Sequence, residues 1–398
     1  MMKIQTAYQI DCLSTQSQLN TLEHEWATLI NGIPGVPIFL TWEWIKTWWE
    51  CFGANQELWL LTARDAQSCL VGIAPLMLQS QRAGLVKLRR LAIIGSGSIF
   101  PVHLNFLVHN MHQDAVTQAF IGYLFNQSNK WDIIGFDSVA QDSAIRRLLL
   151  ALGGRTGEKV VSPYIPLPGS WDIYRMTLTK KLRRNLKYFL SRLESDHPGD
   201  VRFDRQMDLK ELPEVMKRLE ELNQNRRHDQ GLASAFDDPM FCRFHSEIAR
   251  VGLERGWLRL YKLSVDNFVI ALYYCFRFQD RIYAYQMGFD IDWREYSPGR
   301  LLIAHGVESS IKEGASELDW LAGEDEYKMA WTEQVREEYE ILYSRNWIGG
   351  AWIRWKVFQE LLRKKAKQWL PQSAQERIKR FIAARSGSIP EKHEQEGE

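Results

Sequence analysis

The sequence predicts an α+β fold of two tandem units, each with a mixed, mainly antiparallel sheet flanked by helices, followed by a C-terminal helical tail. The order of strands and helices in the first half of the 398 residues returns in the second half. The hairpin turns at Asp65 and Asp266 lie about half the chain apart, as do Asp132 and Asp319 in two strands that follow helices. A period of that length indicates a duplicated unit and not a solenoid. The alternative is an unduplicated α+β chain, in which some similarity between the element orders of the two halves also occurs.

The first half begins with an expected strand at 4–10 and helical patterns at 16–29 and 42–52. Thr41 suits the N-cap of the second of these helices, and Gly53 suits its C′ position. Two apolar segments at 58–65 and 70–78 predict a hairpin joined by a polar turn near Asp65 to Ser68. The remaining expected elements are a strand at 86–94, a helix at 113–125 and a strand at 131–136.

The second half repeats this order. Helical periodicity marks 178–193, 209–225 and 239–254, and strands at 258–266 and 268–278 form a hairpin around Asp266 and Asn267. A third strand at 281–290 leads to a helix at 298–314 that Gly314 closes. A buried strand at 316–323 and a last strand at 337–344 complete the unit.

The composition restricts the classes of function. Lys+Arg 50 against Asp+Glu 49 leaves no global positive field, so no DNA partner is expected. The 5 cysteines have no C-x-x-C spacing, which argues against a disulfide scaffold or a zinc knuckle, and no metal is expected. The N-terminus has no apolar signal segment, and the longest stretch without charged residues, 91–113, is too polar to span a bilayer. We therefore expect a soluble, cytoplasmic protein.

Four segments are expected: 1–170 and 171–345 as the two domains, 346–385 as a helical tail and 386–398 as a disordered terminus. The tail contains ten basic and two acidic residues, and Pro371 separates its first helix from a second at 375–384. Its apolar residues recur at helical spacing: Ile348, Trp352, Trp355, Phe358 and Leu362. Such a basic amphipathic helix suits the inner face of an anionic cell membrane. The alternative is that this face packs on the body of the protein.

Two places carry candidate chemistry in the second half. The first joins a strand to a helix, where Pro298 suits the first helical turn, Gly299 lets a ligand approach the backbone, and Arg300 can pair with a phosphate. The junction comprises Gly288, Asp290, Tyr296, Ser297, Pro298, Gly299 and Arg300. Asp290 at the strand end would orient an acceptor amine or act as base; an ordinary turn and a capped helix are the alternatives.

The second place surrounds the end of the strand at 316–323. Consecutive acids before a Tyr-Lys pair would form a negative pocket for a cationic acceptor, at the end of a strand where ligands bind in α/β sheets. Its members are Asp319, Glu324, Asp325, Glu326, Tyr327 and Lys328. Tyr327 carries a hydroxyl that can give up a proton, and Lys328 would hold a phosphate or sugar acid. A solvated acidic turn is the alternative.

These motifs resemble the Gcn5-related N-acetyltransferase (GNAT) superfamily, in particular its tandem FemAB-like and CelD-type branch. The resemblance covers about 37–343 and rests on FLTWEWIKTWWECFG, LVGIAPLM, KKLRRNLKYFLSRLE, the GFD at 288–290, PGRLLI at 298–303 and GEDEYK at 323–328. It implies that an acceptor amine attacks the thioester of an acyl-CoA directly. It places the thioester-polarising amide near Gly288 and the CoA pyrophosphate at 296–300, with the catalytic Tyr-Lys motif at Tyr327 and Lys328.

The resemblance also leaves alternatives. The usual glycine-rich loop is reduced to one glycine, Gly299, and FemAB relatives use aminoacyl-tRNA instead of acyl-CoA. We expect an acyltransferase acting on an amine or hydroxyl of a sugar, polysaccharide or cell-envelope precursor, with a degenerate first half that shapes the acceptor site. The rivals are a tRNA-dependent aminoacyltransferase, although no long coiled-coil pattern is present, and a non-catalytic assembly factor of an envelope-polysaccharide complex.

Overall fold

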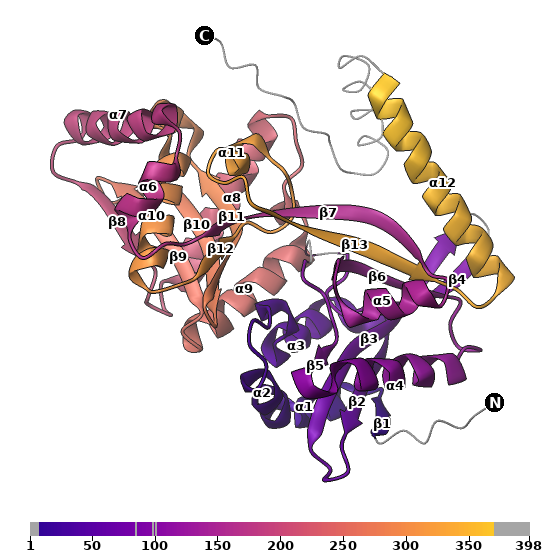
Figure 1. Ribbon diagram of the computed structural model, residues 1–398. Coiled ribbons are helices and arrows are strands. Elements are labelled where there is room, and N and C mark those ends of the chain that lie inside the picture. Colours follow the sequence, from indigo (N-terminus) through magenta and orange to yellow (C-terminus); the bar gives the residue numbers. More distant parts are fainter. Residues whose placement is uncertain (1–7, 84–85, 98, 100–101, 370–398) are drawn as a thin grey trace. The chain divides into compact units, whose positions relative to one another are not determined.

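The computed structural model describes residues 8–83, 86–97, 99 and 102–369. These residues form two compact units (Figure 1). Of the described residues, the first unit contains those up to Ser162 and Val335–Leu361, and the second contains Pro163–Gln334 and the end of the last helix from Leu362 to Trp369. The units therefore differ from the expected domains 1–170 and 171–345, because the last strand of the chain belongs to the first unit. Strand periodicity predicts a strand but not its partner.

The sheet of the first unit follows the order β1-β2-β3-β4-β6-β13-β7. The pairs from β1 to β4 are antiparallel, whereas β4 and β6 are parallel. The strands are β1 (Gln9–Leu13), β2 (Glu57–Arg64), β3 (Leu70–Ala83), β4 (Val86–Ile93), β5 (Leu107–Val108), β6 (Ile133–Ala140), β13 (Val335–Tyr343) and most of β7 (Arg155–Pro166).

Helices pack on this sheet and close its core. They are α1 (Gln16–Thr21), α2 (Glu23–Asn31), η1 (Ile38–Leu40), α3 (Trp42–Phe52), η2 (Gly53–Asn55), η3 (Asn110–His112), α4 (Gln113–Asn126), α5 (Ala144–Ala151) and α12 (Trp347–Trp369). The α12 helix is fixed to the unit by Ile353, which is buried against Leu88, Ile133 and Leu342. None of the described helices is long and apolar enough to cross a membrane.

The sheet of the second unit follows the order β8-β9-β10-β11-β12-β7. Its strands are β8 (Val201–Arg205), β9 (Leu258–Val265), β10 (Phe268–Phe278), β11 (Arg281–Phe289), β12 (Glu317–Asp319) and the end of β7. Its helices are α6 (Trp171–Thr177), α7 (Lys180–Asp196), α8 (Leu212–Asp229), η4 (Ala235–Asp237), α9 (Pro239–Glu254), η5 (Ile291–Tyr296), α10 (Pro298–Lys312) and α11 (Glu326–Met329). The two units thus share the order strand, helices, three antiparallel strands, helix and parallel strand, and the predicted α+β tandem is confirmed.

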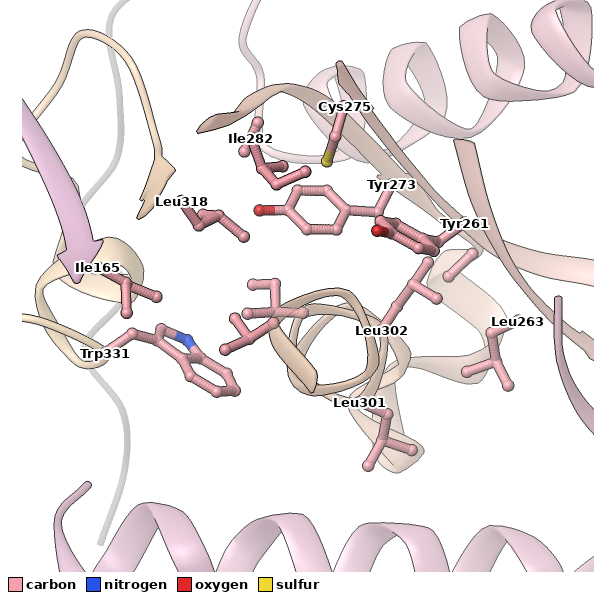
Figure 2. Close-up of a cluster of buried hydrophobic side chains, with 14 of the residues drawn as sticks. Ile165, Tyr261, Leu263, Tyr273, Cys275, Ile282, Leu301, Leu302, Leu318 and Trp331 are labelled. Atoms are coloured by element: carbon pink, nitrogen blue, oxygen red, sulfur yellow. The ribbon is translucent and has the colours of Figure 1, made fainter. Parts of the chain in front are cut away.

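The core of the second unit lies between its sheet and α10. Figure 2 shows Leu302 of that helix beside Tyr261 of the sheet, with Tyr273 next to it. The ring of Tyr273 packs so closely on α10 that a Cβ at Gly306 would lie 3.0 Å from it. On the other face of the sheet, a Cβ at Gly252 of α9 would lie 2.9 Å from Phe276. Helices α10 and α9 therefore pack on the two faces of the sheet of the second unit.

Several local predictions differ from the structure. The expected helix at 16–29 is two helices, because Leu22 ends α1 and precedes α2. The first strand is β1, while residues 4–7 of the strand expected at 4–10 lie outside the described residues. Thr41 caps α3 as predicted, but Gly53 is its C-cap with φ −76°. A Cβ at Gly53 would lie 2.7 Å from Trp49, so close packing requires this glycine. The second tail helix at 375–384 and the terminus 386–398 lie outside the described residues.

Candidate active site

The site begins where two parallel strands of the second unit part. β11 and β12 pair from Arg281 and Glu317 to Tyr283 and Asp319, where β12 ends. β11 continues through residues 284–289 and pairs there with β10. Beyond Tyr283, β11 therefore has β10 as its partner on one side and no pairing with β12 on the other. Parting strands of this kind create a crevice in which backbone groups can meet a ligand.

A β-bulge lies on this part of β11. Tyr274 of β10 opposes Gln286 and Cys275 opposes Ala284, so Tyr285 is the extra residue. A bulge leaves its extra residue outside the regular ladder and turns the adjacent amides. The backbone of β11 is consequently irregular beyond Tyr283, where β12 no longer pairs with it.

Asp290 joins β11 to the short helix η5. Its carboxylate accepts a hydrogen bond from the Asp292 amide at 3.2 Å and pairs with Arg218 of α8 at 2.9 Å. Arg218 also donates to the Val269 carbonyl. Asp290 is therefore held in place by a cap and an ion pair, which suits a residue that positions the junction.

The first turn of α10 packs directly on β11. Ser297 has a left-handed backbone, with φ 48° and ψ 52°, and its side chain does not cap the helix. Pro298 and Gly299 are buried, and a Cβ at Gly299 would lie 3.1 Å from Met287 Sδ and 3.3 Å from Phe289. Glycine is thus required for the close approach. A helix N-terminus that lacks a side-chain cap favours an anion through its amides and its dipole.

Tyr296 and Arg300 flank this turn differently. The Tyr296 hydroxyl donates to Asp196 of α7 at 3.0 Å, and the guanidinium of Arg192 lies over its ring. Burial, with Asp196 adding to it, raises the pKa of Tyr296 above its ordinary value. Tyr296 is therefore a buried support between α7 and η5, whereas Arg300 is half-buried on the first turn of α10.

The second set of predicted residues follows β12. Asp319 is completely buried and accepts a hydrogen bond from the Leu321 amide at 2.7 Å. The chain then turns sharply, because Leu321 has φ 56° and Gly323 has φ 110°. Lys328 is also buried: its ammonium donates to the Ala322 carbonyl at 2.7 Å and lies 3.3 Å from Asp325. Asp319 and Lys328 thus shape the loop from within.

Glu324, Glu326 and Tyr327 are the exposed members of this set. Tyr327 is 48% exposed, although it lies close enough to buried Tyr273 to influence it. Burial raises the pKa of Tyr273 well above its ordinary value, and Cys275 and Tyr327 add to that increase. Since Trp320, next to Asp319, donates to the Tyr273 hydroxyl at 2.6 Å, the loop after β12 and α10 share Tyr273 as a neighbour.

The predicted residues therefore form two sets. Gly288, Asp290 and 296–300 follow β11 into α10, and Asp319 with 324–328 follows β12. Tyr273 links the second set to α10, whereas Asp290 turns toward Arg218 of α8. The parallel ends of β11 and β12 bring both sets to one end of the sheet.

Residues that support the site come from distant elements. Asn223 of α8 is buried and donates to the Met287 carbonyl at 2.8 Å and to the Gln286 side chain at 3.2 Å, which ties α8 to β11 beyond the bulge. Arg218 and Asn223 were not predicted. A polar residue among the buried Leu219 and Leu222 of a helical pattern is the signal that could have indicated Asn223.

The sequence comparisons place a domain family on the second unit. Residues 180–329 match the acetyltransferase (GNAT) domain family, and this range contains both sets. A search among curated proteins finds no match to the sequence.

Solved structures with the same fold extend over most of the chain. A crystal structure of FemX is similar with a TM-score of 0.60 at 12% identity, over 85% of this chain and 98% of that one. The structure of L-PGS from Bacillus licheniformis has a TM-score of 0.51 at 10% identity, over 84% and 95%. The C-terminal domain of a putative lysylphosphatidylglycerol synthetase from Agrobacterium fabrum has a TM-score of 0.50 at 9% identity, over 87% and 98%. At identities this low, the structural similarity shows that these proteins share a fold.

Proposed function

We propose that the chain is an N-acyltransferase of the GNAT type, because residues 180–329 match the acetyltransferase (GNAT) domain family. In this proposal it moves an acyl group from acyl-CoA to an amine, or a hydroxyl, of a sugar, polysaccharide or cell-envelope precursor. The observation that carries this proposal is the parting of β11 and β12 beyond Tyr283 and Asp319, next to the first turn of α10. The open edge of β11 offers amides to the thioester carbonyl, and the first turn of α10 offers amides to the pyrophosphate.

The reaction needs no acyl-enzyme. The acceptor nitrogen attacks the thioester carbon, the tetrahedral oxyanion is stabilised by backbone amides, and collapse expels the CoA thiolate. The acceptor ammonium first loses a proton, because only the neutral amine can attack. The nitrogen loses a second proton after the attack, the thiolate takes one up to become the thiol, and one proton is released to solvent. Glu324 is the base in this proposal, because it is exposed, whereas Asp290, Asp319 and Asp325 are engaged within the fold. Tyr327 is the acid that protonates the thiolate.

The first unit differs at the equivalent position, which supports placing the chemistry in the second. Its parallel strands β4 and β6 pair at Arg90 and Leu91. Further along β6, the Leu104 amide donates to the Ser138 carbonyl, and the adjacent His103 amide donates to Glu338 of β13. A segment of the chain itself lies against β6 where the second unit has an open strand edge. The first unit would then not bind CoA.

Calorimetry with acetyl-CoA and longer acyl-CoA, together with thiol release during turnover, tests this function. Binding in the micromolar to low millimolar range and amine-dependent thiol release are expected. A second candidate, aminoacyl transfer from charged tRNA, is favoured by the similarity to FemX over 85% of this chain. Transfer from charged tRNA without acyl-CoA binding would support this second candidate. A protein that binds neither donor would be an assembly factor.

We also propose that α12 contacts an anionic membrane. The face opposite Ile353 exposes large apolar side chains, with Trp347 79% and Trp355 57% exposed, accompanied by Ile348, Phe358, Leu361 and Leu362. The predicted amphipathic helix is therefore present, and its apolar stripe remains uncovered in the described part of the chain apart from half-buried Trp352. Tryptophans beside basic residues suit the headgroup region of a bilayer.

Vesicle co-sedimentation tests this contact with point variants, because truncation at Tyr343 would also expose the site of Ile353. Trp355→Ser with Phe358→Ser is expected to weaken binding to anionic vesicles. Phe268→Ser with Met111→Ser removes two other exposed apolar side chains and is the matched control. Equal binding by both double variants would contradict the proposal.

A further inference from the structure

The α6–α7 surface of the second unit carries positive charge that the fold does not neutralise. The exposed side chains Lys180, Lys181, Arg184 and Lys187 of α7 make no ion pair or hydrogen bond with any residue that the structure describes. Among the other bases of this helix, Arg192 pairs with Glu295 and Asp196, and Arg183 donates to Met176. The four exposed cations thus form one cluster in the first half of the helix.

This cluster opposes the electrostatics of its own helix. A helix N-terminus carries partial positive charge, so cations there are unfavourable. The first turn of α7 contains Lys180 and Lys181 and no acid, while its last turn contains acids and no base. Both ends therefore carry the charge that the helix dipole disfavours. Residues that conflict with local stability are expected where a function requires them.

The same two helices also expose apolar side chains. Ile173 and Met176 of α6 are 58% and 68% exposed, and Tyr188 of α7 is 57% exposed. Arg183 donates to the Met176 carbonyl at 3.2 Å and lies 3.4 Å from its sulfur, which joins the end of α6 to the first turns of α7. Figure 1 shows α6 and α7 as neighbours at the outer edge of the second unit. The exposed aliphatic groups of α6 are therefore joined through Arg183 to the helix half that carries the cations.

We propose that this α6–α7 surface docks on an anionic phospholipid bilayer. The phosphates attract Lys180, Lys181, Arg184 and Lys187, and the interface takes up Ile173 and Met176. A nucleic acid would satisfy the cations but offers little to two aliphatic side chains, so a lipid surface fits the whole cluster better. The contact is separate from that of α12 and belongs to the unit that carries the acetyltransferase domain.

The experiment uses the full chain in the Trp355→Ser, Phe358→Ser background, so that α12 does not dominate binding. Sedimentation with phosphatidylcholine vesicles is compared with sedimentation with vesicles that contain phosphatidylglycerol. Each cation near an anionic surface strengthens binding about fivefold, so Lys180→Glu with Arg184→Glu is expected to weaken binding to the anionic vesicles by at least about 25-fold. Ile173→Ser with Met176→Ser should weaken it as well. Lys210→Glu with Lys217→Glu changes the charge equally on another surface of the second unit and is the control.

Thermal unfolding checks the folded state of the same variants. Because acids are favourable at a helix N-terminus, Lys180→Glu with Arg184→Glu is expected to unfold at the same or a higher temperature than its parent. The anisotropy of labelled tRNA measures whether the α6–α7 surface binds a nucleic acid instead of a bilayer. Unchanged binding of the Lys180→Glu, Arg184→Glu variant to anionic vesicles would overturn the proposal. So would loss of tRNA binding in that variant while the Ile173→Ser, Met176→Ser variant binds vesicles normally.

Discussion

Lys328 closes the loop after β12 from the inside. Its ammonium, buried with the side chain, bonds to Ala322 and pairs with Asp325. Replacing it by Met would leave the Ala322 carbonyl without this partner, at a cost of about 1–3 kcal/mol. We therefore expect Lys328→Met to lower the free energy of unfolding by that amount in urea titrations. Lys217→Met, at an exposed position, is the control, and equal stability of the two variants would contradict the structural role.

Glu324 and Tyr327 are exposed on the same loop, so conservative changes there should leave its fold intact. Removing a proton-handling group costs about 10²-fold or more in rate. Glu324→Gln and Tyr327→Phe are each expected to lower kcat by about that factor without loss of acyl-CoA binding. Glu326→Gln, the adjacent exposed acid, should retain activity. Full activity in both test variants would show that the chemistry lies elsewhere.

His245 of α9 makes stability depend on pH. Phe241, Phe244 and Tyr285 surround its ring, and burial lowers its pKa from 6.5 to about 3. Between these values the unfolded chain binds a proton that the folded chain does not. The stability present above pH 6.5 is therefore lost as the pH falls toward 3, by about 1.4 kcal/mol per pH unit for this group.

Urea unfolding at pH 7, 5.5 and 4.5 measures this slope. His245→Phe should lose less stability than the wild type between pH 6.5 and 4.5, whatever its stability at neutral pH. His24→Gln replaces an exposed histidine and should keep the wild-type slope. A His245→Phe variant with an unchanged slope would contradict the prediction.

At the scale of elements, those whose own residues determine their conformation could be predicted from the sequence. The hairpin between β9 and β10 was predictable, because Asp266 and Asn267 both adopt positive φ, with values of 50° and 67°, as a two-residue turn requires. Strands β7 and β8 were not predicted, since residues 155–159 and 201–205 are largely polar. Their pairing is set by neighbours distant in sequence, which periodicity does not reveal.

The parts of the candidate site that are contiguous in the sequence were also predictable, whereas the contacts between distant elements were not. The junction from Gly288 to Arg300 is contiguous, so its glycine and proline positions carried the signal. The Arg218 ion pair with Asp290 connects two elements far apart in the chain, and composition gives no indication of it. The bulge at Tyr285 has a signal in the sequence that was not used. The β11 residues that face the core are Ile282, Ala284 and Met287, so the spacing changes from two residues to three at the bulge.

Strand β13 completes the first unit. It pairs with β6, and its Ile341 and Leu342 are fully buried. Burying such side chains contributes about 1.5–3 kcal/mol each, and β6 would otherwise expose an unpaired edge. A chain that ends at Gln334 should therefore lose the folded first unit, whereas a chain that ends at Leu361 should retain it. Circular dichroism and limited proteolysis with mass spectrometry test this, and protection of residues 8–162 in the shorter chain would contradict it.

At the scale of the whole molecule, the second unit is an insertion within the first. The chain leaves the first unit along β7, builds Pro163–Gln334, and returns with β13. The inserted unit has its own core from β7 to α11. We expect residues 163–334 to fold when expressed alone and to unfold cooperatively, as measured by thermal circular dichroism. A fragment without cooperative unfolding would show that the units depend on each other.

The return of the chain with β13 also sets an order of folding during synthesis. A ribosome adds about 5–20 residues per second, so it needs about 10–40 s to pass from the end of the first segment of the first unit to its last strand. The second unit can complete its core within that time, while the nascent first unit still lacks the partner of β6. For this period an apolar strand edge is open to other chains. Crowded polysomes or slow translation would thus favour aggregation through the N-terminal half, and a chaperone that recognises extended apolar segments would bind there first.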